Sequence, residues 1–302
     1  MSPPRERSPS FVGAAYALAA FLFWGGVPIY FKWTADVPPL EVLAHRIAWS
    51  VVMMAGVLTL MGRWRVVGAH LRAPRVMGML LLSALTVSVN WLIFIWAVAQ
   101  GHVLETSLGY FINPLVNVLF GTLFLRERLR LAGWVAVGLA ALGVTFQVVQ
   151  LGQVPVVALV LAFSFGTYGL IRKVVPVDGY SGLYLETLLL SPLALGYLVY
   201  LGVTGAGSFG GHGWEMDIKL ILAGAITAIP LVLFAEGARR LRYSTIGFFQ
   251  YIAPTMSFFL AIWLWHEPFN GVKGVAFGCI WVALAIYTAD SVMARRQGGG
   301  TS

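Results

Sequence analysis

The sequence predicts an all-α polytopic membrane protein, in which ten transmembrane helices form two inverted five-helix repeats. Three observations predict it: the composition, a series of apolar segments, and two similar stretches about 140 residues apart. Of the 302 residues, 59% are hydrophobic and 11% are charged, and the mean hydropathy is +0.83. Soluble domains contain about 25% charged residues. This composition therefore indicates a protein that resides in the lipid bilayer.

Ten segments are long and apolar enough to cross a bilayer, for which a helix needs about 20 residues. They are residues 11–33, 39–62, 76–98, 104–125, 130–150, 154–174, 180–202, 217–238, 243–266 and 271–293. The first is too long for the apolar part of a typical signal peptide, so we expect an uncleaved helix there. The longest connection, residues 203–216, contains five glycines. None of the connections is long enough for a separate soluble domain.

Positive residues are distributed unequally between the two sides that these ten helices define. One side has only Lys32, Lys219 and Lys273. The other side has Arg5, Arg7, Arg63, Arg65, Arg72, Arg75, Arg126, Arg128, Arg130, Arg172, Lys173, Arg239, Arg240, Arg242, Arg295 and Arg296. Because cytoplasmic loops are enriched in Lys and Arg, both termini are predicted to be cytoplasmic. The remaining basic residue, Arg46, lies inside a predicted helix.

Residues 104–130 combine an apolar composition with a polar stripe. Four polar side chains are spaced four, three and four positions apart, which places them on one face of a helix; they are Thr106, Tyr110, Asn113 and Asn117. Pro114 is in mid-span, where it removes a backbone hydrogen bond and favours a kink. The stretch ends at charged residues that include Glu127, for which we expect a salt bridge or a capping role.

A second stretch, residues 244–273, resembles the first. Pro254 precedes Glu267 by thirteen positions, as Pro114 precedes Glu127. At the offset of 140, Gln250 corresponds to Tyr110. The first and sixth segments also align, at an offset of 141. Five helices per repeat is an odd number, so the second repeat enters the membrane from the opposite side. We expect one integrated membrane domain, with repeats at residues 1–151 and 152–302.

The sequence also resembles a known family. The similarity rests on LAHRIAWS (43–50), NWLIFIWAV (90–98), SLGYFINPLVN (107–117), LAFSFGTYGLIRK (161–173), RLRYSTIGFFQYIAPT (240–255) and FGCIWVALAIY (277–287). These segments are similar to the drug/metabolite transporter superfamily, its EamA-type branch and most closely its RarD subfamily. The resemblance implies ten transmembrane helices, a bacterial inner membrane and transport of small organic solutes. It also implies a link to chloramphenicol handling, without supplying a substrate.

Polar groups within a bilayer usually face a cavity, because hydrocarbon does not solvate them. The candidate substrate-binding residues selected on this basis are Trp24, His45, Arg46, Asn90, Trp91, Tyr110, Asn113, Asn117, Tyr168, Glu186 and Gln250. At a helical rise of 1.5 Å per residue, Arg46 lies about 10 Å from the outer surface. We expect Trp24, Asn90 and Tyr110 at a similar depth, lining an outward-facing half of a central cavity with His45.

Each ionisable candidate has two interpretations. Glu186 is expected about 10 Å from the inner surface, in the half shared by Tyr168 and Gln250. It is the first candidate for proton coupling, and a structural ion pair is the alternative. His45 is the second such candidate, because imidazole titrates near neutral pH, or it is a hydrogen-bonded structural residue. Arg46 either serves the substrate or a gate, or it only fixes packing. A direct Arg46–Glu186 pair is not assumed, because their depths differ.

The uncharged candidates also have alternative interpretations. Asn113 and Asn117 either line the cavity or join helices. Pro114 and Pro254 are either hinges for alternating access or static kinks. Most tryptophans are expected as interface anchors. Trp24, Trp91 and Trp96 are exceptions that would suit a flat organic substrate.

The predicted function is therefore secondary transport of a small metabolite or drug through alternating access, with proton coupling as one option. A channel-like permease, a scaffold and an intramembrane enzyme are the alternatives. The sequence has no HExxH, GxSxG or P-loop pattern, and its one cysteine, Cys279, forms no internal disulfide. We expect no cofactor, metal, nucleic acid or ATPase subunit, and we expect the lipid bilayer and a small-molecule substrate as partners.

Overall fold

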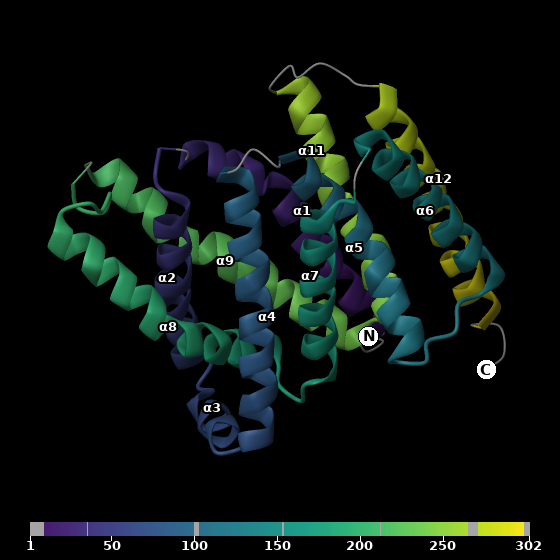
Figure 1. Ribbon diagram of the computed structural model, residues 1–302. Helices are drawn as coiled ribbons and strands as arrows, with labels where there is room; N and C mark the ends of the chain where they lie inside the picture. Colours follow the sequence, from purple (N-terminus) through teal and green to yellow (C-terminus); the bar gives the residue numbers. More distant parts are fainter. Residues whose placement is uncertain are drawn as a thin grey trace, which may run out of the picture.

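The computed structural model describes residues 9–34, 36–99, 103–152, 154–211, 213–264 and 271–298, and these residues form helices joined by short loops, without a strand (Figure 1). The helices are α1 (Pro9–Trp33), α2 (Pro39–Leu60), α3 (Trp64–Leu71), α4 (Pro74–Ala99), α5 (Val103–Leu123), α6 (Leu131–Leu151), α7 (Val156–Val174), α8 (Gly179–Thr204), α9 (Trp214–Arg240), α10 (Tyr243–Gln250), α11 (Ile252–Trp263) and α12 (Gly271–Gly298).

The observed helices follow the predicted segments closely. Nine of the ten segments each correspond to one helix, and the segment 243–266 corresponds to the consecutive α10 and α11. By length and composition, seven of the described helices could cross a membrane, and shorter apolar helices occupy Leu108–Leu123 and Gly278–Asp290. Helix α3, which joins α2 to α4, was not predicted, because an eight-residue amphipathic segment looks like a loop in a hydropathy pattern.

The segment 243–266 was expected to be one membrane helix with a hinge or kink at Pro254, and the structure divides it into α10 and α11 just before that proline. A proline clashes with the carbonyl group four residues earlier and cannot donate a hydrogen bond to it. That carbonyl belongs to Gln250, where α10 ends. Tyr251 instead donates its backbone N–H to the oxygen of Phe248 over 3.3 Å, in a tighter turn. By contrast, α5 continues through Pro114 without interruption, so the two corresponding prolines have different effects.

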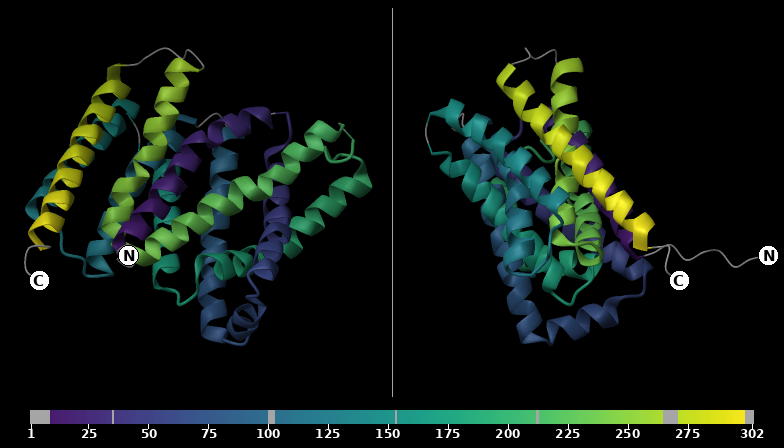
Figure 2. Two further views of the ribbon diagram at one scale, coloured as in Figure 1. Left: turned by 180° about the vertical axis from the view of Figure 1, so that it is seen from behind. Right: turned by 90° about the vertical axis from the view of Figure 1, so that its right-hand side faces the viewer.

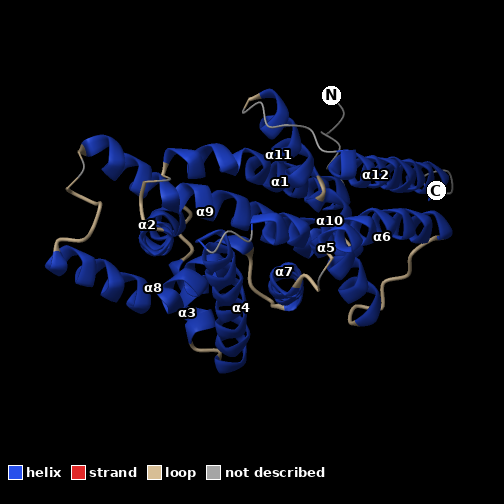
Figure 3. Ribbon diagram, turned by 45° about the horizontal axis from the view of Figure 1, so that its top comes forward, coloured by secondary structure: helices blue, strands red, loops and turns tan. Residues whose placement is uncertain are grey.

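The helices pack across the boundary between the two predicted repeats. Helix α2 packs against α8, α5 against α10, and α6 against α12. Helix α1 packs against α9 and α11, whereas α7 packs against α4 and α5. The α6–α12 pair lies at one edge of the molecule, beside α5 (Figures 1 and 3). The interior of the protein is therefore built mainly from contacts between residues far apart in the sequence.

Two buried carboxylates hold helix ends together. Glu127, in the loop after α5, accepts hydrogen bonds from the backbone N–H groups of Tyr243 and Ser244 at 2.5 and 2.9 Å. These amides open α10 and have no partner within their own helix. Glu236 of α9 likewise accepts the N–H of Gly179, at the start of α8. The expectation that Glu127 is a capping residue is confirmed.

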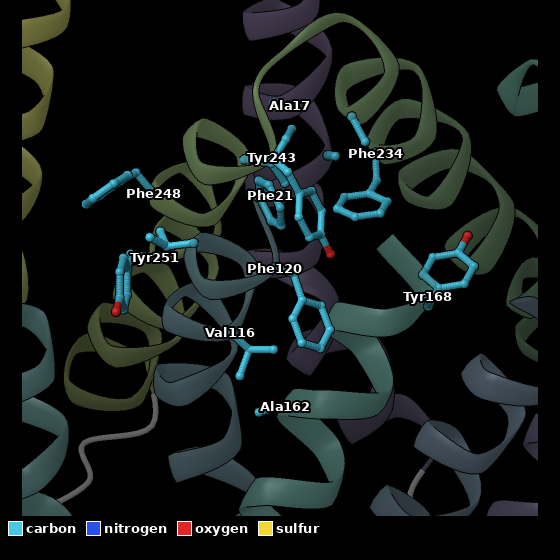
Figure 4. Packing of buried hydrophobic residues seen from close by; sticks show 14 of the residues in the cluster. Ala17, Phe21, Val116, Phe120, Ala162, Tyr168, Phe234, Tyr243, Phe248 and Tyr251 are labelled. Atoms are coloured by element: carbon cyan, nitrogen blue, oxygen red, sulfur yellow. The ribbon is translucent and has the colours of Figure 1, made fainter. Parts of the chain in front are cut away.

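A compact aromatic core fills the centre between α1, α7 and α9. Phe234 is fully buried, and its ring centre is 6.1 Å from that of Phe21 and 6.0 Å from that of Tyr168. Figure 4 shows these rings close to Tyr243, whose hydroxyl donates a 2.6 Å hydrogen bond to the oxygen of Gly166. The start of α1 and the end of α12 lie at the same end of the molecule as α3 (Figure 2).

Helices α5 and α10 cross at Gly247 with almost no space between them. A methyl group added there would lie 2.7 Å from the carbonyl oxygen of Pro114 and 3.2 Å from Cβ of Asn117. Neither group can move without shifting α5. We therefore expect Gly247→Ala to destabilise the protein by about 1–3 kcal/mol, as overpacking does, and to lower the Tm of the detergent-purified protein.

Gly138→Ala in α6 is the matched control, because no described atom lies within 4 Å of the added methyl group. Alanine is the better helix former, so this variant should melt at the same temperature or higher. Equal Tm changes in the two variants would contradict a close α5–α10 crossing.

Candidate substrate site

Arg46 lies on the inner face of α2, surrounded by α1, α4 and α9. Its Nε donates a 2.8 Å hydrogen bond to Oγ1 of Thr227 on α9. The guanidinium carbon lies over two aromatic rings, 5.6 Å from the centre of Phe31 and 4.9 Å from the centre of Trp91. Such cation–π contacts hold the plane of a guanidinium group, at about 0.5–2 kcal/mol each. Four helices therefore fix the position of this positive charge.

A small polar pocket adjoins this region between α4, α5 and α7. Its lining residues are Asn90, Phe94, Thr106, Gly109, Tyr110, Asn113, Leu161 and Phe165. The pocket has a volume of about 30 Å³, which is room for one or two water molecules rather than an organic solute. The sequence correctly grouped three of these polar residues, Asn90, Tyr110 and Asn113, around one space.

The three grouped residues differ in how well their polar atoms are satisfied. Asn90 Nδ2 donates to the oxygen of Leu161 and to Oγ of Ser164, both at 2.9 Å. Asn113 is only 4% exposed, and its Oδ1 has no hydrogen-bond partner among the described residues. An unpaired buried amide oxygen is unfavourable by about 1–3 kcal/mol. Asn113 therefore has an unused acceptor on the wall of the pocket.

Asn117 and Gln250 form a direct link between α5 and α10. Asn117 Nδ2 donates a 2.6 Å hydrogen bond to Oε1 of Gln250, and both residues are buried. The sequence expectation placed Gln250 with Glu186, but its polar contact is to Asn117. For these two amides, helix joining is the observed role.

Trp24 belongs to the aromatic core rather than to the polar pocket. Its ring centre is 5.8 Å from Phe165, the residue that corresponds to Trp24 in the second repeat, and 5.7 Å from Phe234. Phe165 also lines the pocket, so the aromatic core borders it. Trp91 contacts Arg46 as described above, whereas Trp96 is 48% exposed.

Glu186 of α8 forms a buried ion pair that the sequence did not reveal. Its Oε1 lies 3.6 Å from Nη1 of Arg172 on α7, and the two side chains are 3% and 0% exposed. Arg172 was counted among the cytoplasmic loop residues, but it is completely buried. Tyr168, one helical turn earlier on α7, is close enough for an electrostatic interaction with both. The predicted neighbourhood of Glu186 and Tyr168 agrees with this arrangement.

Several polar atoms of the Arg172–Glu186 pair lack a hydrogen-bond partner among the described residues. Apart from the 3.6 Å contact, the carboxylate of Glu186 has only the hydroxyl of Ser83 on α4 close enough to interact, and that contact lacks hydrogen-bond geometry. Arg172 Nη2 donates to the backbone oxygen of Asp178 at 3.1 Å, while Nε and Nη1 make no hydrogen bond there. Gly182 provides the space, because a Cβ at that position would overlap Nη1 of Arg172. A glycine in the first turn of α8 is the sequence signal that was missed.

His45 lines a cavity that does not include Arg46. It lines an apolar space of about 540 Å³ between α2, α8 and the loop that follows α8. Its Nε2 lies 4.0 Å from Oε1 of Glu41, and neither ring nitrogen has a hydrogen-bond partner among the described residues. Consecutive residues on a helix point about 100° apart. The expectation that His45 and Arg46 line one cavity was therefore wrong.

The burial of the Arg172–Glu186 pair leads to a prediction about the stability of variants. Removing one partner of a buried pair leaves an uncompensated charge and destabilises a protein by about 3–5 kcal/mol. We expect Glu186→Ala to lower the Tm of the detergent-purified protein strongly. The double variant Arg172→Met, Glu186→Leu should regain much of the loss, because it buries no charge. An unchanged Tm for Glu186→Ala would contradict the pairing.

Comparisons with known proteins identify the family of this chain. Residues 11–149 match the EamA-like transporter family. An "Uncharacterized transporter" of Vibrio cholerae is 47% identical over 97% of both chains. "Protein RarD" of Escherichia coli is 44% identical over 94% of this chain and 96% of its own. "Chloramphenicol-sensitive protein RarD" of Pseudomonas aeruginosa is 31% identical over 94% and 96% of the two chains.

The fold is also found in a crystal structure that is 22% identical in sequence. The superposition has a TM-score of 0.70 and covers 93% of this chain and 98% of the other. The sequence relatives are named as transporters, and they match nearly the whole chain. The chain is therefore a multi-pass membrane protein that belongs to the EamA-like transporters of the drug/metabolite transporter superfamily, in the RarD subfamily.

Proposed function

We propose that this protein is a secondary transporter that moves a small organic metabolite or drug across the bacterial inner membrane by alternating access. The observation that carries this proposal is the set of incompletely paired polar groups at the centre of an apolar helix bundle. Asn113 lines the small pocket between α4, α5 and α7, and Arg46 on α2 is an electrostatic neighbour of Tyr110, another residue of that pocket. Such groups are unfavourable in hydrocarbon unless a polar ligand or water engages them.

An inverted repeat supports alternating access. Helices α2, α5 and α6 of the first half each pack against their counterparts α8, α10 and α12. Helix α1 packs against α9 and α11. Its counterpart α7 packs against α4, the counterpart of α9, and against α5, the counterpart of α10 and α11 together. This reciprocal pattern is expected of two halves related by a pseudo-two-fold axis. Rocking of one half against the other would expose the central site to each side in turn.

The positions of the helix ends support a cytoplasmic location for both termini. The start of α1 and the end of α12 lie at the end of the molecule where α3 is found (Figures 1 and 2). Arg63 and Arg65 lie there, and so does the α7–α8 loop, whose Asp178 is 3.2 Å from Arg63. Because cytoplasmic loops carry the positive excess, this end is assigned to the cytoplasm.

Proton coupling is proposed to involve Glu186. Carboxylates within transmembrane segments commonly relay protons in transporters. Glu186 has one ionic partner, Arg172, and otherwise unsatisfied oxygens. Loss of its charge on protonation would release Arg172, which also holds the oxygen of Asp178 in the α7–α8 loop. Protonation would thereby be linked to the packing of α7 against α8.

Uptake and counterflow in proteoliposomes test the transport function. The purified protein would be reconstituted and assayed with a panel of radiolabelled metabolites and antibiotics, chloramphenicol included, with and without a pH gradient. Saturable flux that is stimulated by substrate on the opposite side is expected for a transporter. Chemical conversion of the compound would instead indicate an enzyme, and unsaturable flux would indicate a channel.

Glu186→Gln tests the coupling role. Glutamine cannot ionise, but its side-chain oxygen can still accept a hydrogen bond from Arg172, so the fold should be retained better than in Glu186→Ala. We expect gradient-driven accumulation to be abolished while exchange at equal pH stays within about twofold of the wild type. Exchange is the internal control for folding, and an equal loss of both activities would contradict coupling through Glu186.

A further inference from the structure

We propose that the transported substrate is an organic anion, and that Arg46 binds its carboxylate or a similar planar acidic group. This inference rests on the proposed transport function and names the chemical class of the substrate. The names of the relatives described above do not give this chemical class. The inference comes from the charge balance and the geometry around one residue.

Arg46 has no counter-ion in the part of the chain that the structure describes. Every ion pair found within 4.0 Å there involves other basic residues, among them Arg63, Arg172 and Arg240. The electrostatic neighbours of its guanidinium are the phenol groups of Tyr30 and Tyr110, which are uncharged at neutral pH. Buried charges in proteins are normally paired. An uncompensated cation among four helices is therefore a site for an anion that arrives from outside the chain.

The contacts of Arg46 leave its anion-binding edge available. Nε is occupied by Thr227, whose own hydroxyl donates to the oxygen of Ala223 at 2.8 Å. The faces of the guanidinium are engaged by the rings of Phe31 and Trp91. The terminal Nη groups make no hydrogen bond or ion pair to the described residues, and the side chain remains partly accessible. Two parallel N–H groups held in a fixed plane match the two oxygens of a carboxylate.

The surroundings indicate what the rest of the anion is like. Tyr110 lines the small pocket between α4, α5 and α7 and is also an electrostatic neighbour of Arg46, so it connects the guanidinium with that pocket. Its ring centre is 6.2 Å from that of Phe94. Beyond these rings, Asn113 Oδ1 offers an acceptor that is not used by the protein. An anion with a flat apolar body and one hydrogen-bond donor matches the chemistry of these groups, and the pocket would have to widen to admit it, because its volume here is about 30 Å³.

Two carboxylates on the helices around Arg46, Glu41 on α2 and Asp217 on α9, are engaged elsewhere. Glu41 accepts hydrogen bonds from the backbone and side chain of Ser208, at 2.5 and 3.0 Å. Asp217 accepts the N–H of Gly210 at 2.7 Å. Both interact electrostatically with His45, and neither is among the electrostatic neighbours of Arg46. They fix the loop after α8 and leave the charge of Arg46 uncompensated.

The test compares isosteric acids and amides. The probes are benzoate and benzamide, indole-3-acetate and indole-3-acetamide, and phenylalanine and phenylalaninamide. Binding to the detergent-purified protein would be followed through the thermal shift and the quenching of tryptophan fluorescence, because Trp91 contacts Arg46. We expect at least one acid to bind at least tenfold more tightly than its amide. Arg46→Ala should abolish that preference, and Arg46→Lys should retain part of it.

Arg65→Ala is the control for the loss of one positive charge, because Arg65 is exposed on α3 and remote from the site. It should bind the acids as the wild type does. Equal binding of acids and amides, or no binding of any acid, would overturn the inference. So would an acid preference that survives in Arg46→Ala.

Counterflow with the same pairs separates this inference from the transport function. Saturable exchange of an amide that is unchanged in Arg46→Ala would overturn the anion site and leave transport intact. Absence of exchange for all compounds of the wider panel would instead contradict transport. Arg46→Ala must also accumulate in the membrane at the wild-type level; if it does not, Arg46 is a packing residue and the anion site is rejected.

Discussion

The hydrocarbon core of a membrane offers no hydrogen bonds, so each polar group inside this bundle must find its partner within the protein or in its ligand. Most of them do. Glu127 and Glu236 bind the free amides at the starts of α10 and α8, and Asn117 binds Gln250. These contacts join helices that are far apart in the sequence. The few groups left without a partner therefore mark the places where the molecule binds something or changes state.

The surroundings of Arg46 and of Glu186 are two of the incompletely satisfied places among the described residues, and they differ in character. Around Arg46 the charge is fixed by aromatic rings and has no counter-ion among the described residues. Around Glu186 the counter-ion is present, at 3.6 Å, but the hydrogen bonds are missing. The first arrangement suits a ligand that supplies the missing charge. The second suits a switch, because a single proton would remove the attraction that holds α7 and α8 together.

The sequence predicted the helices well because length and hydropathy suffice for membrane spans. Asn90, Tyr110 and Asn113, which it selected as cavity-lining residues, do line one pocket, because Tyr110 and Asn113 share a face of α5 and the depth of Asn90 on α4 could be counted. It missed Arg172, because an arginine next to Lys173 at a helix end looks like a loop residue. Only the packing against Gly182 shows that it is buried. His45 was misplaced because depth along a helix says nothing about direction around it. The two prolines looked equivalent in the sequence, which therefore did not distinguish the break before Pro254 from the continuous helix around Pro114.

The central claim is that a water-accessible chamber lies between the two halves, and cysteine accessibility at Asn113 tests it most directly. Cys279 is the only native cysteine, so Cys279→Ser provides a clean background. Asn113→Cys would be compared with Leu142→Cys on α6, whose side chain is 64% exposed on the surface of the bundle. We predict that a membrane-impermeant thiol reagent modifies the cysteine at position 113 and spares the one at position 142. Equal resistance of both positions, with reaction only toward a lipid-soluble reagent, would contradict the account.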